Sequence, residues 1–128
     1  MDSPSILIPL SITLGAIPGA VSRYYLTRFC AQQFGDNFPY GTFLINLSGS
    51  LLMGLFATLF QRLESLSYLN LLITVGFLGS YTTFSTYALE VSNFFRAGHS
   101  KKAVLYWLGS PVLGIVCVAV GIALAQQF

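Results

Sequence analysis

Hydroxyl and aromatic side chains gather in one stretch of an otherwise apolar sequence, Gly79–Tyr87. Ser and Thr hydroxyls can bond to local backbone groups, and glycine adopts unusual dihedral angles without penalty. This stretch can therefore adopt several non-helical backbone conformations. A chain that leaves the helix here frees carbonyl oxygens beside hydroxyls and aromatic rings, and such groups bind ions. The sequence contains no nucleophile–base set and no metal-ligand cluster, so we do not expect an enzyme.

The stretch lies inside an apolar segment, residues 66–95, that is longer than one straight membrane span needs to be. As a single helix the segment would be roughly 45 Å long, against a hydrocarbon core of roughly 30 Å. We therefore expect a helix that is broken near residues 79–83. Irregular backbone at membrane depth is tolerated only where it is buried in protein or lines a wet cavity, and the ends of broken helices suit ions.

The composition is that of an integral membrane protein. Of the 128 residues, 55% are hydrophobic and 8% are charged, whereas soluble domains carry about 25% charged residues. The net charge of +2 is small and scattered, which argues against a nucleic-acid partner. Cys30 and Cys117 lack metal-ligand spacing, and we expect them to be packing residues.

The expected fold class is all-α, with four transmembrane helices in a single domain that covers residues 1–128. Gly15 and Gly19 are four residues apart in the first span, which is a pattern that lets another helix approach closely. The third span is the broken one. The four predicted spans cover residues 5–29, 40–60, 66–95 and 103–125.

Few polar side chains lie within these spans, and each has two interpretations. Asn46 either makes an interhelical hydrogen bond or offers a donor amide to a polar pathway. Arg23 either extends to the interface or has a buried, paired role. Glu90 is the only carboxylate among the apolar residues of any span and fits the water interface, and Ser110 either bonds to its own helix or offers a hydroxyl to an ion. Tyr106 is interpreted as an interfacial aromatic residue.

The run Gly76–Tyr87 reads Gly-x-x-Gly-x-x-Thr-Thr-Phe-Ser-Thr-aromatic, and it resembles the signature of the Fluc (CrcB-type) fluoride channels. Further matches lie at Gly19–Tyr24, Tyr40–Asn46 and Gly49-Ser50, so the resemblance covers nearly the whole chain. It implies a fluoride-selective channel of the cell (inner) membrane that allows passive fluoride export. It also implies an antiparallel, dual-topology dimer with two pores.

The resemblance implies a fluoride pathway along the ring edges of Phe84 and Tyr87. Fluoride is small and tightly hydrated, and the positive edges of aromatic rings bind an anion more weakly than a fixed cation does, which suits conduction. On spacing alone, aromatic residues three positions apart would be read as packing. The resemblance also implies pore positions for Asn46 and Glu90. By their chemistry, the hydroxyls of Ser85, Thr86 and Ser110 are further candidate donors along the pathway.

Tyr87 departs from the pattern, because the family usually has Phe at this position. The phenol keeps the ring edge and adds an oxygen with three possible fates: it donates to fluoride, bonds elsewhere, or narrows the path. From the sequence we expect Tyr87→Phe to be tolerated.

The resemblance also implies a structural Na⁺ at the dimer centre, bound by the backbone carbonyls of Gly79 and Thr82, and an interior position for Arg23. Carbonyl oxygens are suitable ligands for hard cations. One chain supplies only two of them, so a two-fold partner is needed to complete the site.

Lys and Arg residues outside the apolar cores are unevenly distributed. The side with the loops after the first and third spans carries four of them, and the opposite side carries only Arg62. This bias favours the first side in the cytoplasm, yet it is small enough to allow insertion in both orientations. We expect a homodimer, with a heterodimer of this chain and a paralogue as the alternative. The four residues are Arg28, Arg96, Lys101 and Lys102.

A small four-helix drug/proton antiporter is the alternative function. That chemistry requires a carboxylate deep in the first span to exchange protons for a cationic substrate. Here the first span carries Arg23 and no acidic residue, which argues against an antiporter.

Overall fold

The computed structural model describes the backbone of residues 3–128 and the side chains of residues 6–128, and the described chain is all-helical. Helices α1, α2 and α6 are each long and apolar enough to cross a membrane, in agreement with the prediction of an all-α membrane protein. The third predicted span consists of shorter helices. The elements are α1 (Ser3–Phe34), α2 (Tyr40–Arg62), η1 (Glu64–Leu66), α3 (Ser67–Asn70), η2 (Leu71–Leu78), α4 (Gly79–Tyr81), α5 (Ser85–Arg96) and α6 (Ser100–Ala125).

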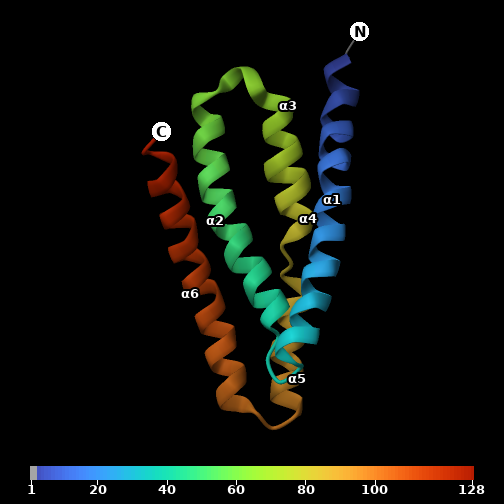
Figure 1. Ribbon diagram of the computed structural model, residues 1–128, viewed down its shortest axis with the longest axis vertical. Coiled ribbons are helices and arrows are strands. Elements are labelled where there is room, and N and C mark those ends of the chain that lie inside the picture. Colours follow the sequence, from blue (N-terminus) through green and yellow to red (C-terminus); the bar gives the residue numbers. More distant parts are fainter. Residues whose placement is uncertain (1–2) are drawn as a thin grey trace.

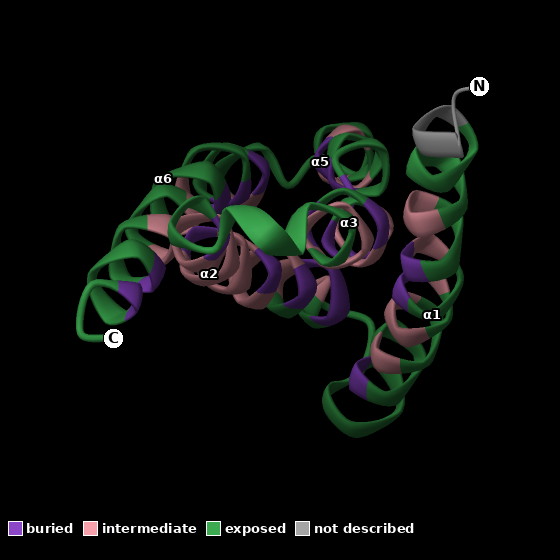
Figure 2. Ribbon diagram, turned by 90° about the horizontal axis from the view of Figure 1, so that it is seen from above, coloured by how far each residue is buried: buried purple, intermediate pink, exposed green. Residues whose placement is uncertain are grey.

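The helices stand side by side, and α1 and α6 form the two outer rods (Figure 1). Helix α1 packs against η2 and α4, and α2 packs against α6. The two ends of the described chain and the turn that contains η1 lie at one end of the bundle, whereas the α1–α2 and α5–α6 loops lie at the other. Seen from above, buried residues face the inside of the bundle, and the outward faces are exposed (Figure 2).

Glycines let the helices approach each other closely. A Cβ atom on Gly15 would lie 1.9 Å from the carbonyl oxygen of Leu72, and one on Gly76 would lie 2.4 Å from that of Ile12. The predicted close approach at Gly15 and Gly19 is therefore confirmed, and the neighbour is the helix that precedes the break. On the other side of the bundle, a Cβ atom on Gly54 would lie 2.3 Å from the carbonyl oxygen of Val118.

The predicted break is present, but its extended part begins later than expected. Helical backbone continues from Ser67 to Tyr81, the chain is extended at Thr82 (φ −80°, ψ 160°), and the helix resumes at Ser85. Gly79, which the sequence predicted to lie in the break, is helical (φ −62°, ψ −35°). The Ser80 hydroxyl explains this difference, because it donates to the Gly76 carbonyl of its own helix and to the Ala16 carbonyl of α1.

The helix before the break is wider than an ordinary α-helix. Leu71–Leu78 has π-helical turns, and the N–H of Gly79 reaches the carbonyl of Thr74, five residues earlier. Such turns are rare and frequently occur at functional sites. Cys30 is buried, as expected of a packing residue, whereas Cys117 is only half-buried; both are free thiols.

Candidate functional site

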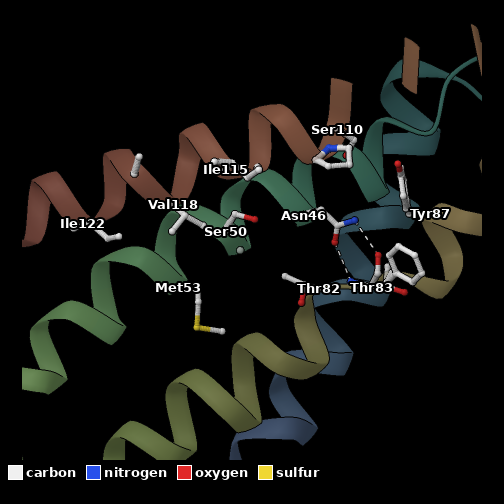
Figure 3. Close-up of a pocket in the computed structure, with 15 residues that line it drawn as sticks. Asn46, Ser50, Met53, Thr82, Thr83, Tyr87, Ser110, Ile115, Val118 and Ile122 are labelled. Carbon is white, nitrogen blue, oxygen red and sulfur yellow. Dashed lines mark hydrogen bonds between the residues drawn. The ribbon is translucent and has the colours of Figure 1, made fainter. Parts of the chain in front are cut away.

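A groove of about 770 Å³ opens beside the break, between α2, α6 and residues 82–87. Along α6 its wall is apolar, with Ile115, Val118 and Ile122 (Figure 3). Apart from Ser50, which lies farther along the groove, the polar side chains gather at the end nearest the break, where α2, α6 and the broken segment meet. They are those of Asn46, Thr82, Thr83, Tyr87 and Ser110.

Asn46 holds the break in place with two hydrogen bonds. Its Nδ2 donates to the carbonyl oxygen of Thr83 at 2.9 Å, and the N–H of Thr83 donates to its Oδ1 at 2.9 Å (Figure 3). Both main-chain groups of a buried, non-helical residue are satisfied in this way. The side chain therefore makes the interhelical bond that one interpretation expected. It also lines the groove, and its second N–H is not needed for this pair.

Several carbonyl groups at the break lose the donors that a continuous helix would supply, those of Gly79 and Thr82 among them. In such a helix the N–H of Thr83 would bond to Gly79, and that of Thr86 would bond to Thr82. Here the Thr83 N–H donates to Asn46, and the Thr86 N–H donates to Oγ1 of Thr83 at 3.3 Å. The carbonyls of Gly79 and Thr82 are thus among those that lose their helical donors at the break.

Aromatic rings form a continuous column from the break toward the α1–α2 loop. The ring of Phe84 is 78% exposed, and its centroid lies 5.8 Å from that of Tyr87. The Tyr87 ring meets Tyr106 edge-on at 5.1 Å, and Tyr106 in turn meets Phe38 at 5.2 Å and Phe94 at 6.2 Å. Phe84 is the exposed end of this column.

The hydroxyl of Tyr87 bonds elsewhere, which decides among the three fates that the sequence left open. It donates to the main-chain carbonyl of Trp107 in α6. The ring remains in the wall of the groove, with 5% of the side chain exposed.

Glu90 is fixed between α2 and α6 by two donors. Its Oε1 accepts a hydrogen bond from Oγ1 of Thr42 at 2.6 Å, and its Oε2 accepts one from the Tyr106 hydroxyl at 2.9 Å. Glu90 and Thr42 line a second pocket of about 650 Å³, which opens toward the α1–α2 and α5–α6 loops. Glu90 therefore lies at the far end of the aromatic column from Phe84.

Three residues of this arrangement were missed or misread in the sequence. The interpretation of Tyr106 as an interfacial residue is wrong, because its side chain is 3% exposed and bonds to Glu90. Thr42 and Thr83 were not singled out. Spacing could have found two of the three, because Thr42 precedes Asn46 by four positions and Tyr106 precedes Ser110 by four, and side chains so spaced share a helix face.

Some of the predicted site residues lie outside the groove. Ser85 and Thr86 are exposed, and their hydroxyls lie 3.5 Å and 3.2 Å from Oγ1 of Thr83. Arg23 is half-buried on α1, four residues after Gly19, which packs against Ser80. The groove of one chain thus combines four of the predicted pathway residues, which are Asn46, Phe84, Tyr87 and Ser110.

A family model described as "CrcB-like protein, Camphor Resistance (CrcB)" matches residues 10–122, a range that includes the break, the groove and Glu90. The chain belongs to the CrcB-like family. Its relatives carry the name of an ion channel, so the family is one of transport proteins rather than enzymes.

Several curated CrcB-like relatives match this chain over almost their full length. The "Fluoride-specific ion channel FluC" of Synechocystis sp. is 53% identical over 124 residues, which are 96% of this chain and 95% of the relative. The protein of the same name from Synechococcus sp. is 47% identical over 127 residues, or 98% of each chain. That of Chloroflexus aurantiacus is 42% identical over 120 residues, or 93% of this chain and 95% of the relative.

The substitution Asn46→Leu is expected to loosen the break, because leucine offers Thr83 neither a donor nor an acceptor. A buried polar group without a partner costs ~1–3 kcal/mol, and the N–H of Thr83 should exchange about tenfold faster for each 1.4 kcal/mol lost. Hydrogen–deuterium exchange of a peptide that spans the break measures this rate. Asn46→Asp keeps the acceptor for the Thr83 N–H and should give an intermediate rate. Unchanged exchange in Asn46→Leu would show that the pair does not hold the break.

Proposed function

We propose that this chain is a fluoride-selective channel that lets fluoride leave the cell passively, and that two pores form in an antiparallel homodimer in the cell (inner) membrane. One observation carries the proposal. A helix break within an apolar bundle is fixed by the pairing of Asn46 with Thr83, and it opens onto a groove lined by ring edges and a few polar groups. The names of the curated relatives support fluoride as the permeant ion.

The groups at the break suit a small anion that must not bind too tightly. The positive end of the α5 dipole lies at the break, where an anion is favoured. Asn46 has a free N–H, Ser110 has a hydroxyl, and the rings of Phe84 and Tyr87 present positive edges. Among the described residues that line the groove there is no Lys or Arg, so binding can remain weak enough for the ion to leave.

The pathway then follows the aromatic column toward Glu90. The Thr42 and Tyr106 hydroxyls point at the Glu90 carboxylate, and this polar cluster lies where the second pocket opens toward the loops. Glu90 thus marks the proposed end of the pore. Ser85 and Thr86 lie at the start of α5 and contribute their hydroxyls through Thr83.

The state of the break in a single chain supports the proposal of a partner chain. The carbonyls of Gly79 and Thr82 lack their helical donors, and the Phe84 ring is 78% exposed. Irregular backbone cannot face lipid, so at membrane depth this region must be covered by protein. A two-fold copy would cover it with the same region and bring the number of carbonyl ligands to four, which is enough to hold a structural Na⁺. The broken segment would then cross the membrane as well, which brings the number of crossings, with α1, α2 and α6, to four.

The C-terminal end of α4 supports a cation at the centre of this dimer. The negative end of a helix dipole lies there, on the side of the break opposite to α5. The Na⁺ would occupy the carbonyl side, and fluoride would pass on the α5 side. Arg23 follows Gly19 on the α1 face that packs against Ser80, and we propose a structural, electrostatic role for it inside the dimer.

We expect Phe84→Ile to abolish fluoride flux in a protein that still folds, because isoleucine keeps an apolar side chain and loses the ring edge. The measurement is fluoride efflux from liposomes that contain the purified variant. Phe95→Ile is the matched control, since Phe95 is an exposed aromatic residue on α5 outside the groove. A rate near wild type for Phe84→Ile would contradict the proposed pathway.

The homodimer requires that a single sequence insert in both orientations. The α1–α2 and α5–α6 loops lie at the same end of the bundle (Figure 1). Most of the Lys and Arg residues lie at that end, but they are few, so the charge bias toward one orientation is small. The alternative is a heterodimer with a paralogue of opposite bias.

Cysteine labelling in cells distinguishes the two assemblies. Single cysteines at Ser67 and His99, at opposite ends of the bundle, are introduced after Cys30 and Cys117 have been replaced by Ala. A homodimer predicts that an impermeant reagent labels part of the population at each position from outside. Labelling at only one of the two positions would exclude dual insertion and imply a missing partner.

A further inference from the structure

Pro111 lines the groove, and it deprives one main-chain carbonyl of α6 of its helical donor. It lies inside α6, and a proline has no N–H to donate to the carbonyl four residues earlier. That carbonyl belongs to Trp107. In a membrane there is no water to take the place of the missing donor, so such a carbonyl requires another partner.

The hydroxyl of Tyr87 is that partner. It donates to the Trp107 carbonyl, and the bond therefore joins α5, directly after the break, to α6. Tyr87 and Pro111 both line the groove, and in Figure 3 Tyr87 lies at the end of the groove near Ser110. The Tyr87 ring is also fixed on both sides, by Phe84 at 5.8 Å and by Tyr106 at 5.1 Å.

We propose that Tyr87 is a positioning residue of the channel, and that its hydroxyl is required because Pro111 leaves the Trp107 carbonyl without a helical donor. The bond has two consequences for an anion. It fixes the direction of the Tyr87 ring edge, and it covers a carbonyl oxygen whose negative partial charge would otherwise oppose the anion at this end of the groove. The inference rests on the proposed function as a fluoride channel.

This inference reverses one expectation from the sequence. The family pattern led us to expect that Tyr87→Phe would be tolerated, since the ring is kept. In this chain the same change would leave the Trp107 carbonyl without a donor. If residue 111 had an N–H, the helix itself would satisfy that carbonyl, and phenylalanine at position 87 would then be harmless.

A double-mutant cycle tests this dependence. Fluoride efflux is measured for wild type, Tyr87→Phe, Pro111→Ala and the double variant, in liposomes with less than one channel per vesicle on average. The fraction of vesicles that release fluoride counts active channels, and the rate of release reports conduction. With Pro111 present, we expect Tyr87→Phe to slow the rate about tenfold, because a polar group is left without its partner. In the Pro111→Ala background, we expect the same change to slow the rate by less than about twofold. A purely structural role would lower the fraction of active vesicles and leave the rate unchanged, which would overturn the inference.

Pro18→Ala provides the matched control. Pro18 lies inside α1, away from the groove, so the effect of Tyr87→Phe should stay about tenfold in that background. If Tyr87→Phe slows the rate equally in the wild-type and Pro111→Ala backgrounds, the inference is overturned. Fluoride release by the wild-type protein would still uphold the proposed function in that case. An absence of fluoride release from wild type would overturn both. If Tyr87→Phe alone does not assemble, the double variant decides: a rate near wild type supports the inference, and failure to assemble overturns it.

Discussion

The pairing of one amide side chain with one non-helical residue underlies this structure. A membrane span can leave the helix only if its main-chain groups find partners within the protein. Asn46 provides both for Thr83, with two bonds of 2.9 Å, from the neighbouring helix α2. The backbone at the break can therefore be extended inside the apolar bundle, and the proposed ion sites depend on that extended backbone.

The break separates two helix ends of opposite polarity. The helix that ends at Tyr81 presents its negative end and the affected carbonyls, and α5 presents its positive end from Ser85 onward. The proposed cation and anion sites near one break therefore rely on helix ends, and no Lys or Arg is among the described residues of the groove. A drug/proton antiporter would instead need a carboxylate in the first span, whereas Glu90 lies on α5 and both of its oxygens are occupied by hydroxyl donors.

The sequence predicted those features that depend on local chemistry or on the family motif. Glycine and hydroxyl residues located the break to within three residues, and the small residues at Gly15 located the close helix contact. The exact start of the break was not predictable, because Ser80 bonds both to its own helix and to Ala16 of a distant one. The π-helical turns before the break have no sequence pattern of their own.

Features that depend on how the helices are rotated against each other escaped prediction. Tyr106 lies near the start of its span, which suggested an interfacial residue, and only the position of α5 shows that it bonds to Glu90. The fate of the Tyr87 hydroxyl depends likewise on the placement of Trp107 opposite α5. The family matches identified Phe84, Tyr87 and Asn46, and hydroxyl chemistry suggested Ser110. The structure brings these four residues together in one groove.

The most direct test of a fluoride channel built on this break is ion release from liposomes that contain the purified wild-type protein and no other. Vesicles are loaded with either fluoride or chloride at equal concentration, and the membrane potential is set by a potassium gradient with valinomycin. The weakly binding, ring-lined groove at the break predicts rapid release of fluoride and retention of chloride. Equal release of both ions, or retention of fluoride, would contradict it.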